Sequence, residues 1–132
     1  MLNEFTAWAD KIKPEITEIS GILSERLSDE PEELISDLKD AEVWNHRMSA
    51  LLAQANSWLD QFSLFAIPAK EGRTEMDRKI LLDSETSPIR LMRDTLESLC
   101  DSIKQRLILG ESILSYEKQF IERDPKPMQR LY

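Results

Sequence analysis

The stretch "SPIRLMRDTLESLCDSIKQRL", residues 87–107, carries the clearest structural signal in the chain. Its apolar side chains recur at alternating spacings of three and four residues, at Ile89, Met92, Leu96, Leu99, Ile103 and Leu107. That spacing places them on one face of an α-helix, in the pattern by which one helix packs against another. Ser87 can cap this helix and Pro88 suits its first turn. The pattern predicts a long helix from about residue 87 to about residue 122.

Upstream, the same spacing appears near the N-terminus, at Phe5, Ala9, Ile12, Ile16, Ile19 and Leu23. Pro14 lies inside this pattern and predicts either a kink or a break after Lys13, because proline lacks the backbone N–H that a helix interior uses.

A second long helix is predicted from about residue 30 to about residue 65, ending before Pro68. Its apolar positions are Leu34, Leu38, Ala41, Met48, Leu52, Ala55, Leu59 and Phe62. Ser28 or Asp29 can cap it, and Pro31 suits its first turn. Asn45 occupies the one polar position of this series. Either it helps to fix register, or it lies at the edge with Trp44 turned inward.

Two breaks divide the long helices. "IPAKEGRTE", residues 67–75, predicts a loop, and "SETSP", residues 84–88, predicts a second break. The short periodic stretch between the breaks is compatible with either a short helix or an extended arm. The expected fold is all-α and a single domain, residues 1–132. Within it we expect an acidic helical region at residues 1–66, a basic loop at residues 67–79 and the C-terminal helix at about residues 87–122.

Helices of about 35 residues reach roughly 50 Å at about 1.5 Å per residue, which is too long for a round domain made by one chain. Long apolar faces of this kind are commonly buried against other subunits. We therefore expect a helical hairpin or bundle completed by homo-oligomerisation. The expected subunit interface consists of Leu96, Leu99, Ile103 and Leu107.

Composition narrows the class of protein further. The chain has 132 residues, which suits one domain, and its three glycines disfavour an all-β fold. Cys100 is the single cysteine, so an internal disulfide is impossible. The first 15 residues lack the basic start and apolar core of a secretion signal, and no apolar run approaches the ~18 residues of a membrane span. A cytoplasmic protein with no membrane partner is expected, in the bacterial host cytoplasm if a phage encodes it.

Enzymatic chemistry finds little support in the sequence. His46 is the single histidine and has no companion motif, and Cys100 is better interpreted as a small buried hydrophobe. No phosphate-binding glycine loop, Ser–His–Asp set or dinucleotide fingerprint is present. We expect no catalytic residue, no metal site and no cofactor. The acidic run from Asp29 to Glu42 is either a solvated helix face or a docking surface for a basic partner.

Charge is distributed unevenly along the chain. Residues 1–66 contain 13 acidic and 5 basic residues, whereas residues 67–132 contain 12 of each, although the whole chain has a net charge of −8. The bases of the second half begin with Lys70, Arg73, Arg78, Lys79, Arg90 and Arg93. Repeated around an assembly, they can follow a phosphate backbone. The alternative is that they pair with the acidic first half of a neighbouring subunit.

The second half also resembles a known family. "EMDRKILLDSE", followed by "LESLCDSIKQRLILGESIL", is similar to the UvsY-type recombination mediators of T-even phages in a Met-Asp-Arg after a charged loop and in a late "L-x-x-L-x-D-x-I-K-x-R" run. The resemblance implies a cytoplasmic helical ring that binds single-stranded DNA and helps to load a recombinase onto DNA covered by single-strand-binding protein. The bases at matching places are Arg78, Lys79, Lys104 and Arg106.

The leading hypothesis is therefore a non-enzymatic, phage-type recombination or replication accessory protein that binds single-stranded DNA. Its candidate DNA-binding residues are Lys70, Arg73, Arg78, Lys79, Arg90, Arg93, Lys104 and Arg106. Two alternatives stay open. One is a helical adaptor or inhibitor that binds only proteins, and the other is a coiled-coil assembly protein of a virus.

Overall fold

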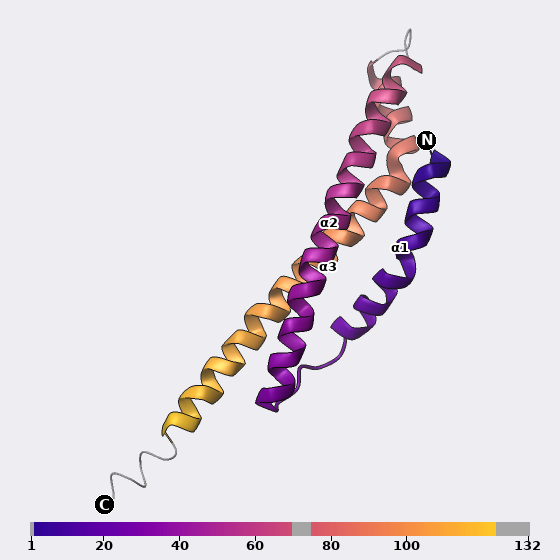
Figure 1. Ribbon diagram of the computed structural model, residues 1–132. Coiled ribbons are helices and arrows are strands. Elements are labelled where there is room, and N and C mark those ends of the chain that lie inside the picture. The colour runs from indigo at the N-terminus through magenta and orange to yellow at the C-terminus, as the bar shows by residue number, and fades with distance from the viewer. Residues whose placement is uncertain (1, 70–74, 124–132) are drawn as a thin grey trace, which may run out of the picture.

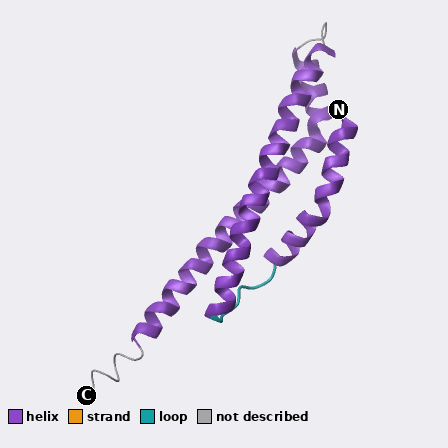
Figure 2. Cartoon of the chain, in the orientation of Figure 1, coloured by secondary structure: helices purple, strands orange, loops and turns teal. Residues whose placement is uncertain are grey.

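The protein is an elongated bundle of three α-helices, seen in a computed structural model that describes residues 2–69 and 75–123 (Figure 1). Helix α1 spans Leu2–Leu23, α2 spans Pro31–Ala69 and α3 spans Glu75–Arg123. These described residues contain no strand, which confirms the all-α prediction (Figure 2). At about 1.5 Å per residue, the 39 residues of α2 reach roughly 58 Å and the 49 residues of α3 roughly 73 Å.

The predicted break at residues 84–88 is wrong, because α3 runs through it without interruption. Pro88 is exposed, so its ring lies on the solvent side of the helix, while Thr86 and Ile89 are buried on the packed side. The Thr86 hydroxyl donates a hydrogen bond of 2.7 Å to the carbonyl of Leu82. Burial on both sides of the proline holds together a helix that the local sequence alone disfavours. The same helix settles the open question about residues 75–86, which are helical.

The other prolines act in two ways. Pro14 lies within α1 without ending it. Because Pro14 is exposed, the helical hydrogen bond that it cannot donate is missing on the solvent side. Helix α2 starts at Pro31, close to the predicted start, and ends at Ala69 rather than before Pro68. Ser28 stabilises its start by accepting a hydrogen bond from the Glu30 N–H at 3.2 Å and donating one to Glu33 at 2.7 Å. The predicted loop 67–79 is therefore helical on both sides of residues 70–74, which lie outside the described residues.

Helices α2 and α3 form a long antiparallel hairpin, and α1 lies along one side of it (Figure 1). Three apolar clusters follow one another along the bundle. The middle cluster joins all three helices and includes Ile12, Met48 and Leu96. Toward the end where α2 meets α3, a second cluster forms around the mutually contacting rings of Phe5, Trp8 and Trp58.

The third cluster lies at the opposite end and fixes the turn between α1 and α2. Leu27 is buried there with Leu34 and Leu38, against Leu107 and Ile113 of α3. Gly110 is buried next to Leu38, and a Cβ at residue 110 would collide with that side chain. Gly110 therefore marks a place of close contact between α2 and α3.

The four residues of the expected subunit interface lie in the core of the three-helix bundle. Leu96 and Ile103 are fully buried and Leu99 is 8% exposed, all within a single chain, and Leu107 packs against the same cluster. The physical reason is that the hairpin gives the apolar face of α3 partners in α1 and α2. These side chains are thus occupied before any second copy is considered. Self-association of the chain stays a prediction.

Replacing Leu96 by Ala should lower the free energy of unfolding by about 2–5 kcal/mol, because the cavity lies among three helices. Leu91 is the matched control, since it lies on the same helix but is 70% exposed, so Leu91→Ala should change stability by less than about 0.5 kcal/mol. Urea denaturation followed by circular dichroism measures both. Equal effects of the two substitutions would contradict the packing described here.

Candidate nucleic-acid interface

The candidate DNA-binding bases do not form a single patch. Lys70 and Arg73 lie outside the described residues, and Arg78 lies in the first turns of α3 with a side chain that is likewise not described. Lys79 is exposed on α3, close to the point where the hairpin turns (Figure 1). Among described residues Lys79 forms no ion pair, so its ammonium group is available to a ligand.

Arg90 and Arg93 lie farther down α3, and each already has an acidic partner. Arg90 pairs with Asp83 at 2.9 Å, and Arg93 pairs with Asp94 at 3.0 Å. Both pairs are partly exposed to solvent, so each contributes little to stability, about 0–1 kcal/mol. A phosphate can compete for these guanidinium groups, but it has to displace a carboxylate first.

Lys104 and Arg106 lie near the far end of the bundle and differ in environment. Lys104 is exposed and pairs with no carboxylate in the described part of the chain. Arg106 is half-buried and donates from Nη1 to the backbone carbonyl of Glu25 at 2.9 Å. This bond links α3 to the segment that follows α1. Arg106 therefore has a packing role in this fold, although its motif is similar to that of a DNA-binding family.

The hairpin end extends beyond α1, which does not cover it (Figure 1). Three large apolar side chains are exposed there, Leu64 on α2 and Met76 and Ile80 on α3. Met76, Lys79 and Ile80, which lie within two turns of α3, form a surface that we call the tip. A base flanked by exposed apolar groups suits a ligand that offers both negative charge and flat apolar surface.

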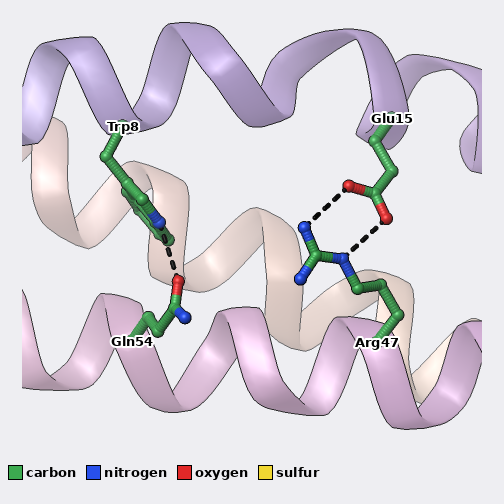
Figure 3. A network of polar contacts seen from close by, with 4 residues as sticks. All are labelled: Trp8, Glu15, Arg47 and Gln54. Atoms are coloured by element: carbon green, nitrogen blue, oxygen red, sulfur yellow. Dashed lines mark hydrogen bonds and ion pairs between the residues drawn. The ribbon is translucent and has the colours of Figure 1, made fainter.

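Two polar contacts that the sequence did not reveal hold α1 against α2 (Figure 3). The Trp8 indole N–H donates to Gln54 Oε1 at 2.7 Å, and Arg47 makes a two-pronged ion pair with Glu15 at 2.8 and 3.1 Å. The hydrogen bond with Glu15 raises the pKa of Arg47. A tryptophan and a glutamine 46 residues apart carry no sequence signal for contact.

The residues considered for catalysis lie apart from one another. His46 is exposed on α2, and Cys100 is buried in the middle cluster, where burial raises the pKa of its thiol. Within the described ranges, no three His, Cys, Asp or Glu side chains are grouped as a metal ion would require. None of the described helices is both long and apolar enough to cross a membrane.

One open groove of about 360 Å³ lies between α1 and α3. Phe5, Ala9 and Ile16 line it from α1, and Leu91 and Met92 line it from α3. Its walls are mostly apolar, with Asp10 and Lys13 paired at its rim at 3.2 Å. The groove contains no cluster of bases and is distinct from the tip.

No family model, curated protein or solved structure matches this chain. The likeness to the UvsY-type mediators thus depends on residues of the second half of the sequence alone. Function has to be inferred from the charges and the exposed surfaces of the bundle.

A pair of substitutions separates structural bases from available ones. Arg106→Met should lower the free energy of unfolding by about 1 kcal/mol, because the Glu25 carbonyl loses a charged donor. The loss should be small for a charged hydrogen bond, because the substitution also removes Arg106 Nε, a donor that is buried without an acceptor among the described residues. Lys104→Met should leave stability unchanged. Chemical denaturation decides between these outcomes, and equal losses would refute the assignment of roles.

Proposed function

We propose that this protein is a non-enzymatic accessory protein of DNA recombination or replication that binds single-stranded DNA at the tip of its helical hairpin. The observation that carries the proposal is the separation of charge along the bundle. Arg78 and Lys79 lie in the first turns of α3, at the end where α2 and α3 meet and close to the acidic Glu75 and Asp77, whereas the acidic run from Asp29 to Glu42 lies at the start of α2, at the opposite end (Figure 1).

The end where α2 and α3 meet is less acidic than the start of α2, so it is the more favourable of the two ends for a polyanion to approach. With about 58 Å between the two ends of α2, the acidic run lies several Debye lengths away from the tip at physiological salt. A net charge of −8 therefore does not prevent DNA from binding locally at the tip. Binding should be orientation-specific and moderate in strength, because few phosphates are contacted.

The tip offers a single strand contact mainly through charge. Lys79 supplies charge for phosphates, whereas the exposed Met76 and Ile80 are not aromatic and are no stacking platform for bases. A phosphate contact does not depend on base identity, so the proposal includes no sequence preference. Loading of a recombinase, which the family resemblance implies, is part of the proposal as the role that such binding would serve.

The adaptor hypothesis has its own support in the exposed apolar side chains on α2 and α3 away from the tip, among them Val43, Leu91 and Tyr116. A protein that binds only other proteins would use these surfaces and would ignore DNA. The two functions therefore differ in a direct binding experiment.

The test is fluorescence anisotropy with a labelled oligothymidylate at several salt concentrations. The unmutated protein should bind with an affinity that falls as salt rises. Arg78→Glu combined with Lys79→Glu should weaken binding and lower the slope of log affinity against log salt by about 0.7 for each lost phosphate contact. The matched control is Lys11→Glu combined with Arg26→Glu, which changes net charge equally on exposed residues away from the tip.

Equal weakening by both double variants would mean that overall charge, and not the tip, controls binding. An absence of salt-sensitive binding by the unmutated protein would refute the DNA-binding proposal and leave the adaptor as the better account.

A further inference from the structure

Helix α2 carries a continuous face that no part of the described chain covers. Among its described side chains, the large exposed apolar ones are Ile35, Val43 and Leu64, which are 42%, 65% and 71% exposed. On a helix of 3.6 residues per turn, Val43 and Leu64 fall on the side opposite to the buried Met48, with Ile35 beside them. We call the side of α2 that carries them its outer face.

Small side chains lie near the centre of the outer face, next to the exposed His46 one turn before Ala50. Ala50, Ala53 and Ser57 are exposed there, at spacings of three and four residues. Small residues at a helix contact let two helix axes approach closely, at the lower end of the usual range of about 8–10 Å. The Ser57 hydroxyl accepts a hydrogen bond from Gln61 at 3.0 Å, so it has a partner within its own helix.

The sequence of this face is complementary to itself when two copies run in opposite directions. A two-fold axis at Ala50 places Val43 opposite Ser57, each seven residues from the axis. Ile35 and Leu64 then lie at nearly the same level, fifteen and fourteen residues from Ala50. The apolar ends of the face thus meet each other, and its small centre meets itself.

Two of the charges on the face follow the same symmetry, whereas the exposed Glu32 and Glu42 have no basic counterpart across the axis among the described residues. Lys39 and Asp60 lie eleven and ten residues on either side of Ala50, so each faces the other's copy across the axis. Both side chains are exposed, and neither forms an ion pair with the described residues of its own chain. A parallel arrangement would instead place Lys39 against Lys39 and Asp60 against Asp60, which repel.

The same antiparallel arrangement brings the opposite ends of two copies together. Ala69, at the end of α2, and Glu30, just before its start, are nineteen and twenty residues from Ala50. The tip of one copy, with Lys79, would therefore lie beside the start of the acidic run of the other. The uneven distribution of charge becomes favourable in such a pair.

We propose that two copies of this chain associate antiparallel through the outer faces of α2, with Ala50 at the two-fold axis and Lys39 paired to Asp60 of the partner subunit. The interface involves neither the buried face of α3 nor the groove between α1 and α3. It does not depend on DNA binding. Because opposite charges meet across it, the dimer weakens as salt rises.

The first experiment measures the dimer dissociation constant by sedimentation equilibrium in the absence of DNA. Val43→Glu should raise that constant roughly 10- to 100-fold, since it buries an unpaired carboxylate at the interface. Leu91→Glu is the matched control, because Leu91 is similarly exposed but lies on α3. It should have no effect.

The second experiment is a charge exchange. Lys39→Glu and Asp60→Lys should each weaken the dimer by facing like charges, and the double variant Lys39→Glu with Asp60→Lys should restore it. Circular dichroism checks that all variants keep their helix content. Restoration requires that the two positions face each other, so a merely unfolded variant cannot imitate it.

The third experiment tests direction. A mixture of Val43→Cys and Ser57→Cys proteins should form a mixed disulfide dimer under mild oxidation, whereas Val43→Cys alone should cross-link poorly. Efficient cross-linking of Val43→Cys with itself would indicate a parallel pair and overturn the proposal. So would a monomeric mass at all concentrations up to about 100 µM, a concentration at which even a micromolar dimer is largely formed.

The DNA-binding proposal is kept separate by one further measurement. The Val43→Glu protein should bind oligothymidylate at least as tightly as the unmutated protein, because Val43 lies outside the tip. Loss of the dimer with DNA binding retained would support both proposals. If Val43→Glu leaves the dissociation constant unchanged, the outer-face dimer is refuted whatever the result with DNA.

Discussion

The burial of the apolar face of α3 within its own chain is the constraint on which the rest of this structure depends. Leu96 and Ile103 are fully buried between α1 and α2. Because α2 folds back along α3, each long helix covers much of the other, and α1 closes the middle of the hairpin. What remains exposed is therefore determined by this packing, namely the outer face of α2, the outer side of α3 and the tip.

Charge is organised by the same hairpin. The folded chain is a rod with the acidic run from Asp29 to Glu42 near one end, and with Arg78 and Lys79, close to Glu75 and Asp77, at the other. Both proposals follow from this polarity. A single strand of DNA and the acidic run of a second copy are alternative partners of opposite charge for the same tip, so each should be sensitive to salt.

The sequence was sufficient for the fold class and for most helices, because the three–four spacing of Leu, Ile and Phe reports the packed face directly. It failed at residues 84–88, where local rules for Ser and Pro favour a break. There the burial of Thr86 and Ile89 outweighs local preference, and the exposed side of the helix accommodates Pro88. Local propensity is a weak guide where the residues before and after an unfavourable residue are buried by tertiary packing.

The candidate site was less accessible to prediction. Charge counts identify bases, but only the fold shows that Arg106 donates to the Glu25 carbonyl and that Arg90 and Arg93 already have carboxylate partners. The contact between α1 and α2 through Trp8 and Gln54 likewise joins residues far apart in sequence. The sequence also suggested that the apolar face of α3 meets another subunit, because periodicity shows which face is buried and not what buries it.

Whether that face is buried within one chain can be measured by the distance between spin labels at residues 39 and 111, two exposed positions next to the contacting pair Leu38 and Gly110. Labelled protein would be diluted with an excess of unlabelled protein. The hairpin predicts a short distance, on the order of 10–20 Å for helices packed about 8–10 Å apart, which dilution does not change. A short distance that disappears on dilution would show that the contact is made between subunits, and a long distance would contradict the hairpin itself.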